Sequence, residues 1–184
     1  MDDRIAISRI KQGDLNGLDT LVHRYQVQAV HAAYLILYDR ALAEDVAQTA
    51  FVKTVESIHQ FDEERPFAPW FFRIVVNDAL KLAKKQKRHL PLEEFDGQTK
   101  QIADWLIHPG ASPEQQIEQK ELRETILQAL QYLSPEQRAV IAMRYFLEMS
   151  EVDMSTKMER PLSTIKWWLR DARKRLYNLM SNSR

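Results

Sequence analysis

The sequence contains no cysteine, only four glycines and no long apolar run. Without cysteine the chain can form no disulfide framework, no thiolate nucleophile and no cysteine-ligated zinc site. No stretch reaches the ~18 uninterrupted apolar residues of a membrane-spanning helix, and the acidic start MDDRIAISRI does not resemble a signal peptide. We therefore expect a cytoplasmic protein with no membrane insertion.

Signatures of catalysis are scarce as well. The five histidines follow no metal-binding spacing: His23, His31, His59, His89 and His108. The chain has no glycine-rich phosphate loop and no nucleophile elbow. Neighbouring acids such as Glu44 and Asp45 lack a partner base. The sequence predicts no enzyme, no metal and no cofactor.

A net charge of zero hides strongly charged blocks. Residues 65–90 and 160–184 each carry a net charge of +6, whereas residues 1–64 and 91–121 each carry −5. Because local fields depend on such blocks, the two basic patches predict two nucleic-acid contacts on separate bodies. Solvated helix faces are the alternative explanation for either patch.

Helical periodicity in the first half of the chain predicts an all-α fold. One helix is expected from about Asn16 to Tyr38, and Asp39 is a good N-cap for the next. The buried face of that second helix comprises Ala47, Ala50, Phe51, Thr54, Val55 and Ile58. A third helix, with Pro69 expected as its first residue, has an apolar back and a basic front.

Residues 89–111 mix proline, glycine and acidic residues without a sustained period, which indicates a flexible acidic linker. Capping boxes at Ser112 and Ser134 predict two further helix starts. A short helix over residues 153–158 and a last helix capped by Ser163 or Thr164 complete a helix-turn-helix.

The last helix has a core face and a basic face. The core stripe comprises Ile165, Trp168, Leu169, Ala172, Leu176 and Leu179. The residues left facing outward are Lys166, Trp167, Arg170, Arg173 and Lys174. Basic residues near the start of a helix that follows a short turn are typical of a helix that enters the major groove.

Five segments, in order, resemble the extracytoplasmic-function (group IV) sigma factors of RNA polymerase. Gly13-Asp14 followed by LDTLVHRY, then LAEDVAQTAFVK, then FDEERPFAPWFFRIVVNDAL are similar to sigma region 2. SPEQQIEQKELRETILQALQYLSPEQRAVIAMRYF and PLSTIKWWLRDARKRL are similar to region 4. The resemblance implies two small helical domains: region 2 over residues 1–88 and region 4 over residues 112–184, joined by the linker 89–111.

The resemblance also implies partners and surfaces. Region 2 would bind the clamp helices of the polymerase β′ subunit through Asp45, Gln48, Val52 and Lys53, and region 4 would contact the β flap. Thr49 replaces a glutamate common in the family motif. A free monomer, controlled by an anti-sigma factor or another regulator, is expected.

Two promoter elements would be read. The residues expected to capture a flipped base of the −10 element and to hold its backbone are Phe61, Asp62, Phe67, Trp70, Arg73, Asn77, Lys81 and Lys84. Those expected at the −35 element are Ser163, Thr164, Lys166, Trp167, Arg170, Arg173 and Lys174.

Region 4 departs from the family pattern at several positions. Glu159 stands where a turn glycine is usual, Trp167-Trp168 replaces a serine-arginine pair, and Asp171 replaces an arginine, which should weaken phosphate contacts. The tryptophans are expected either to read an unusual element or to bind a regulatory protein. A helix-turn-helix repressor with a helical dimerisation or ligand domain is the competing function, but it leaves the basic helix at 69–88 without a role.

Overall fold

The computed structural model describes residues 2–86 and 125–181, and within those ranges all regular structure is helical. The linker and the Ser112 capping box lie outside the described residues. The N-terminal helices are α1 (Asp3–Lys11), α2 (Asn16–Leu37), α3 (Arg40–Ser57), the single turn η1 (Ile58–Gln60) and α4 (Phe67–Gln86). The C-terminal part comprises a helical segment at 125–131, α7 (Pro135–Ile141), the π-helical η2 (Ala142–Phe146), α8 (Glu151–Met158) and α9 (Leu162–Ser181).

The helix boundaries confirm two of the capping predictions, Asp39 and Ser134. Asp39 accepts a hydrogen bond from the Leu42 amide and so caps α3. At Ser134 both reciprocal bonds of a capping box with Gln137 are present. The starts of α4 and α9 were predicted two residues or more too late: α4 begins at Phe67, and α9 begins at Leu162, so neither Ser163 nor Thr164 is a cap.

Helix α1 was not predicted from the sequence. Its buried side chains Ala6, Ile7 and Ile10 pack on α2. Gly17 allows the close approach, because a Cβ there would collide with the carbonyl oxygen of Ala6. Tyr25 of α2 adds a polar contact, because its hydroxyl donates a hydrogen bond to Asp3 at the start of α1.

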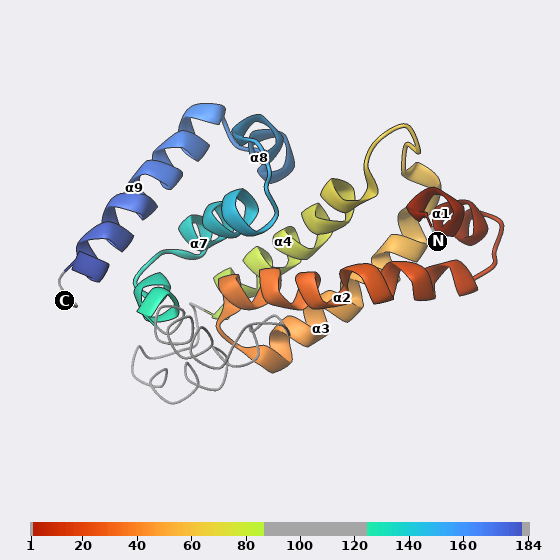
Figure 1. The fold of residues 1–184 in the computed structure, drawn as a ribbon, viewed down its shortest axis with the longest axis horizontal. Coiled ribbons are helices and arrows are strands. Elements are labelled where there is room, and N and C mark those ends of the chain that lie inside the picture. The colour runs from red at the N-terminus through yellow and green to blue at the C-terminus, as the bar shows by residue number, and fades with distance from the viewer. Residues whose placement is uncertain (1, 87–124, 182–184) are drawn as a thin grey trace, which may run out of the picture.

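Helices α2, α3 and α4 pack together (Figure 1). Aromatic side chains form the core between them. Phe71 is fully buried between Tyr25 and Phe51, with ring centroids 6.0 Å and 4.6 Å away. Lys53 of α3 donates to Asp78 of α4 at 2.7 Å, which joins the two helices at the edge of this core. The core thereby fixes which faces of α3 and α4 remain exposed.

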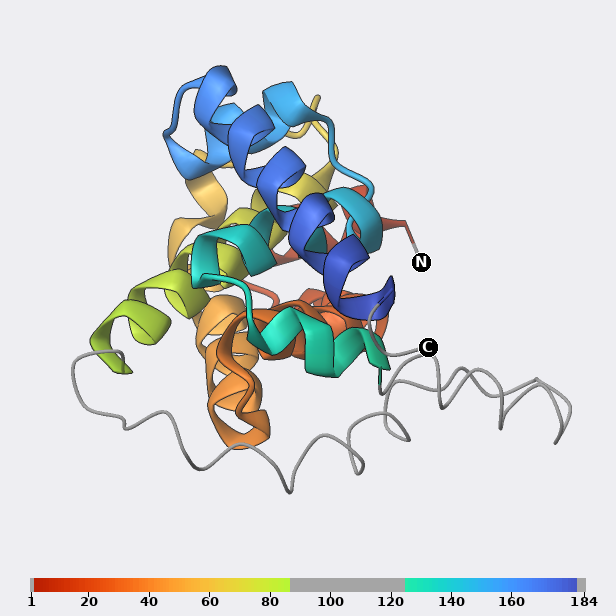
Figure 2. The ribbon, with the colours of Figure 1, turned by 90° about the vertical axis from the view of Figure 1, so that its left-hand side faces the viewer.

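The C-terminal helices pack directly on the N-terminal ones, with α7 against α2 and α4 (Figures 1 and 2). Arg138 of α7 donates from Nε and Nη2 to the carbonyl oxygen of Ile36, at 3.0 and 2.6 Å. Its guanidinium lies 5.0 Å from the ring centroid of Tyr38, whose hydroxyl donates to the Leu127 carbonyl. Burial lowers the pKa of Arg138 and raises that of Tyr38. These buried polar contacts connect the two halves of the chain.

Candidate polymerase and promoter surfaces

The residues predicted to bind polymerase lie along one side of α3. Asp45, Gln48 and Val52 are exposed, and the Val52 side chain is 58 % exposed although it is apolar. Lys53 is different, because its ammonium group is engaged by Asp78. The structure therefore leaves three of the four predicted residues available on this face.

A groove of about 610 Å3 lies beside that face, between α2 and α3. Its lining residues are Val22, Gln26, Val27, Val30, Arg40, Glu44, Ala47, Gln48 and Phe51. Val27 is 61 % exposed, and the sequence interpretation missed it. The sequence carried a signal for this residue, because Val27 is an apolar residue between two glutamines, Gln26 and Gln28. The same pattern, an apolar residue among polar ones, had selected Val52.

The predicted −10 surface is only partly accessible. Phe61 and Phe67 were expected to form walls for a flipped base, but they are only 4 % and 3 % exposed and belong to the aromatic core. The Phe61 centroid lies 5.7 Å from Phe67 and 5.2 Å from the half-buried Trp70. Both phenylalanines are too deep to contact DNA in this conformation, since the loop before α4 folds them onto Tyr25 and Trp70.

The remaining predicted −10 residues lie at the surface of α4 or in the loop before it. Asp62 is exposed and pairs with Arg65. Asn77 is half-buried, and Lys81 is exposed. Arg73 and Lys84 are engaged by acids of the C-terminal helices: Arg73 donates to Glu159 at 2.7 Å, and Lys84 lies 3.7 Å from Glu136.

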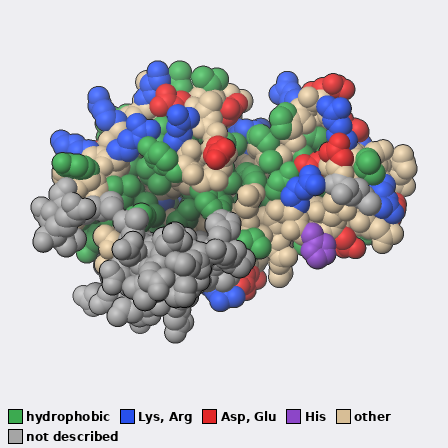
Figure 3. Space-filling view, in the orientation of Figure 1, with side chains coloured by type: hydrophobic (Ala, Val, Ile, Leu, Met, Phe, Trp, Pro, Cys, Tyr) green, Lys and Arg blue, Asp and Glu red, His purple; other side chains and the backbone are tan. Residues whose placement is uncertain are grey.

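Helix α9 presents the predicted basic face. The exposed residues on it are Ser163, Lys166, Trp167, Arg170, Arg173 and Lys174, with the half-buried Thr164 at its edge. Several basic side chains gather over the lobe formed by α8 and α9, with apolar and acidic side chains among them (Figure 3). Arg173 also lies 5.6 Å from the ring of Tyr145, an exposed aromatic residue that the sequence interpretation did not single out. A basic helix with an exposed tryptophan in its second turn has the composition of a major-groove reader.

The two unusual features of α9 differ in their surroundings. Trp167 is 52 % exposed, whereas Trp168 is half-buried against the core formed with Ile165 and Leu169. Asp171 does not point into the basic face: its carboxylate accepts from Gln137 at 2.6 Å and pairs with Arg175. Asp171 therefore has a structural role in joining α9 to α7, in place of the weakening of phosphate contacts that we expected.

Among the described residues no cluster of three or more histidine, aspartate or glutamate side chains is arranged to hold a metal ion. Nor is any helix in those ranges both long and apolar enough to span a bilayer. Two helical parts, each carrying a basic helix face, have the charge pattern of a two-part DNA-binding protein.

Comparison with known families shows to which family of DNA-binding proteins the chain belongs. The model of sigma-70 region 2 matches residues 21–89, and that of sigma-70 region 4 matches residues 123–176. The chain belongs to the sigma-70 family, in its extracytoplasmic-function group. It is a sigma factor, which directs RNA polymerase to initiate transcription at particular promoters. A helix-turn-helix repressor would leave the region 2 match unexplained.

Curated relatives match over most of their own length. The chain is 27 % identical to RNA polymerase sigma-H factor of Pseudomonas aeruginosa, covering 89 % of this chain and 86 % of that protein. It is 28 % identical to the ECF sigma factor SigW of Bacillus subtilis, with 87 % of each covered. The ECF sigma-E factor of Escherichia coli is 26 % identical, with 97 % and 94 % covered.

Two solved structures have a similar fold. CnrH in complex with the cytosolic domain of CnrY aligns with a TM-score of 0.66 at 21 % identity, covering 99 % of both chains. The sigma factor RpoE of Bartonella quintana, bound to the anti-sigma factor NepR, aligns with a TM-score of 0.60 at 23 % identity. That alignment covers 90 % of this chain and 99 % of RpoE.

Proposed function

We propose that residues 1–88 bind the β′ clamp helices of polymerase through the exposed side of α3, and that residues 112–184 contact the β flap and the −35 element. Asp45, Gln48 and Val52 form the centre of the α3 contact, and the adjacent groove extends it onto α2. The exposed Val52 carries this proposal, since an apolar side chain within a polar stripe gains more from a protein partner than from water.

A binding measurement with purified polymerase core tests this surface. We expect Val52→Glu to weaken core binding by roughly tenfold or more, because it places a charge where an apolar contact is desolvated. Ile5→Glu is the matched control, since Ile5 is 54 % exposed on α1, away from α3. Equal affinities of both variants and the wild-type protein would overturn the assignment.

For promoter DNA we propose that Asp62, Trp70, Arg73, Asn77, Lys81 and Lys84 form the −10 surface. Ser163, Thr164, Lys166, Trp167, Arg170, Arg173 and Lys174 form the −35 surface. Support comes from their position at the surface of α4, of the loop before it and of α9, where each is exposed or half-buried, and from the positive charge of both helices. Phe61 and Phe67 are left out because they are buried.

We further propose that an anti-sigma factor or another regulatory protein controls this sigma factor, which acts in the cytoplasm as a monomer when free of polymerase. The similar folds of CnrH and RpoE, each solved with a bound protein, support a regulator. Trp167 is the better anchor for such a partner than Trp168, because half of Trp167 is exposed.

A further inference from the structure

The loop between η1 and α4, residues 61–66, carries Asp62 of the proposed −10 surface and has no helix of its own to hold its shape. Within it the Arg65 amide donates to the Asp62 carbonyl oxygen at 3.0 Å, and the Glu64 amide donates to the Asp62 carboxylate at 3.1 Å. These bonds form a turn, but they do not attach it to the rest of the fold. Contacts from other elements must therefore decide where Asp62 lies.

The two ends of this loop are anchored by buried rings. Phe61 precedes the turn and Phe67 follows it, and both belong to the aromatic core. Between them Asp62, Glu64 and Arg65 are exposed, whereas Glu63 is half-buried. The burial of Glu63 within an exposed turn indicates a partner for its carboxylate.

Lys11, the last residue of α1, supplies that partner. Its Nζ donates to the carbonyl oxygen of Phe61 at 3.0 Å and lies 2.8 Å from Oε1 of Glu63. Only 23 % of the Lys11 side chain is exposed, so water competes weakly for the ammonium group. One cation thus binds the backbone before the turn and a carboxylate within it, and α1 lies beside η1 at this point (Figure 1).

Helix α1 is a firm support for this contact, because its own position is fixed by α2. Its residues Ala6 and Ile10 are buried on α2. At Gly17 the two backbones approach so closely that a Cβ would lie 2.3 Å from the Ala6 carbonyl oxygen. At the other end of α1, Asp3 accepts a hydrogen bond from the hydroxyl of Tyr25. Lys11 therefore joins the loop to a helix that is held at both ends.

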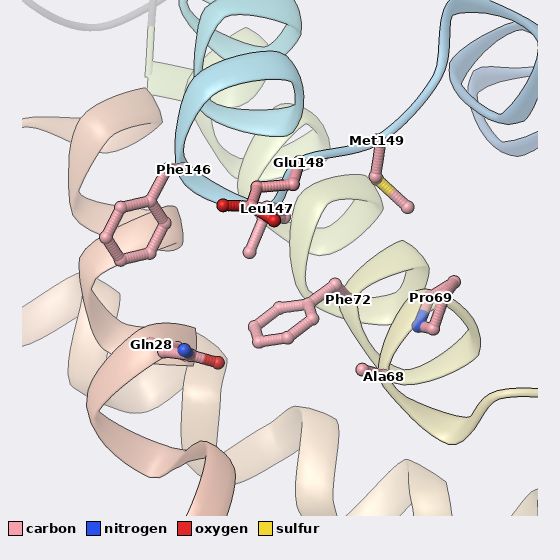
Figure 4. Close-up of a pocket in the computed structure, with 8 residues that line it drawn as sticks. All are labelled: Gln28, Ala68, Pro69, Phe72, Phe146, Leu147, Glu148 and Met149. Carbon is pink, nitrogen blue, oxygen red and sulfur yellow. The ribbon is translucent and has the colours of Figure 1, made fainter.

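The C-terminal helices do not fill the space beside the start of α4. A pocket of about 300 Å3 lies between Ala68 and Pro69 on one side and residues 146–149 on the other (Figure 4). The first turn of α4 thus borders open space there. The placement of the loop before α4 consequently depends on its buried rings and on Lys11.

Lys11 also changes the charge that the loop presents. Residues 62–64 are three consecutive acids, and unpaired carboxylates there would repel the phosphates of DNA. Lys11 pairs with Glu63, and Arg65 pairs with Asp62 at 3.2 Å. The turn is therefore closer to neutral than its sequence alone suggests.

We propose that Lys11 is a positioning residue for the −10 surface, which holds the 61–66 loop so that Asp62 meets the −10 element in one fixed arrangement. The inference rests on the proposed −10 surface. Helix α1, which precedes the segment matched by the region 2 model, thereby takes part in promoter opening without contacting DNA. A loop that is already ordered loses less conformational entropy when it captures a base.

The first test follows the loop itself. We compare 15N order parameters of the Glu64 and Arg65 amides in the free full-length chain and in Lys11→Met, which keeps the length of the side chain and removes its charge. We expect about 0.85 in the wild-type protein and a decrease toward about 0.6 in the variant. Arg4→Met is the matched control, since Arg4 is an exposed cation of α1 and no ion pair joins it to the loop among the described residues. Equal order parameters in the two variants would refute the proposal.

The second test measures promoter opening by polymerase holoenzyme. The probe is a promoter fragment selected with wild-type holoenzyme from a random-sequence library by run-off transcription, and timed permanganate footprinting follows its unpaired thymines. At saturating holoenzyme we expect Lys11→Met to slow opening about threefold to tenfold, with unchanged affinity for polymerase core. Lys11→Arg should restore at least half of the wild-type rate, since arginine can donate to both acceptors. If Lys11→Met opens the promoter as fast as Arg4→Met does, Lys11 has no positioning role.

A salt titration separates positioning from direct contact with DNA. Loss of one phosphate contact lowers the slope of the logarithm of the binding constant against that of the salt concentration by about 0.7–0.9, as we expect for Lys81→Ala. Lys11→Met should keep the wild-type slope. A slope lowered as in Lys81→Ala would mean that Lys11 binds a phosphate, and the positioning role would be wrong.

Two substitutions within the −10 surface distinguish a failure of this inference from a failure of the proposed function. Slow opening by Asp62→Ala and Asn77→Ala, together with normal opening by Lys11→Met, refutes the positioning role alone. Normal opening by all three variants refutes the −10 surface as well.

Discussion

Trp167 and Trp168 show how one helical position changes the role of a side chain. Trp167 lies on the basic face of α9 with 52 % of its surface exposed, whereas Trp168 is rotated toward Ile165 and Leu169 and packs on the core. The helical period alone predicted this division, because successive residues differ by about 100° around the axis. We therefore expect Trp168 to contribute to the stability of the fold and Trp167 to contribute to binding.

We predict that Trp168→Ala lowers the free energy of unfolding by about 2 kcal/mol, less than the ~3–5 kcal/mol of a fully buried aromatic residue. Trp167→Ala should change it by less than about 0.5 kcal/mol and should instead weaken promoter-specific transcription. Urea denaturation of each variant and run-off transcription with polymerase core measure the two effects. Equal stability losses would show that the two side chains are packed alike.

The junction of α7 and α9 illustrates how the elements of the helix-turn-helix are joined. Gln137 closes the capping box at the start of α7 and also donates to Asp171 in the middle of α9. Gln137 is 3 % exposed, so its amide depends on these partners. The hydrogen bond thus joins the start of α7 to the middle of α9.

We predict that Gln137 and Asp171 are energetically coupled. In a double-mutant cycle with Gln137→Ala and Asp171→Ala, the losses in unfolding free energy should be non-additive by about 1 kcal/mol. Asp45→Ala, on α3, replaces Gln137→Ala in the control cycle and should be additive with Asp171→Ala. Additivity in both cycles would mean that the hydrogen bond between Gln137 and Asp171 contributes nothing to stability in solution.

At the scale of the whole molecule, buried tyrosines tie stability to alkaline pH. Burial, together with the hydrogen bond to Asp3 and its charge, raises the pKa of Tyr25 to about 12. Burial also raises the pKa values of Tyr34 and Tyr38 above their ordinary value of 10.0. The folded state therefore holds these protons at a pH where the unfolded chain releases them.

We predict that stability is constant with respect to these groups below about pH 10 and falls between about pH 10 and 12. Urea midpoints measured across this range test the slope. Tyr38→Phe should make the decline less steep, whereas Tyr177→Phe, at a position 73 % exposed, should leave the slope unchanged. An identical slope for both variants would contradict the burial argument.

The sequence by itself determined the helices and their faces. Periodicity and caps depend on neighbours within a few positions, so Asp39, Ser134 and the basic stripe of α9 could be recognised locally. The family resemblance was accessible for the same reason, since its motifs are short and ordered. Helix α1 was not predicted, because its position depends on a close contact with Gly17.

Only the tertiary structure decided which of those faces are free. Phe61 and Phe67 could be counted as DNA-binding residues until the fold buried them against Tyr25 and Trp70. Arg138 reaches Ile36 across 102 positions, and Glu159 reaches Arg73 across 86. Contacts at such separations follow from the packing of whole helices, and no local pattern encodes them.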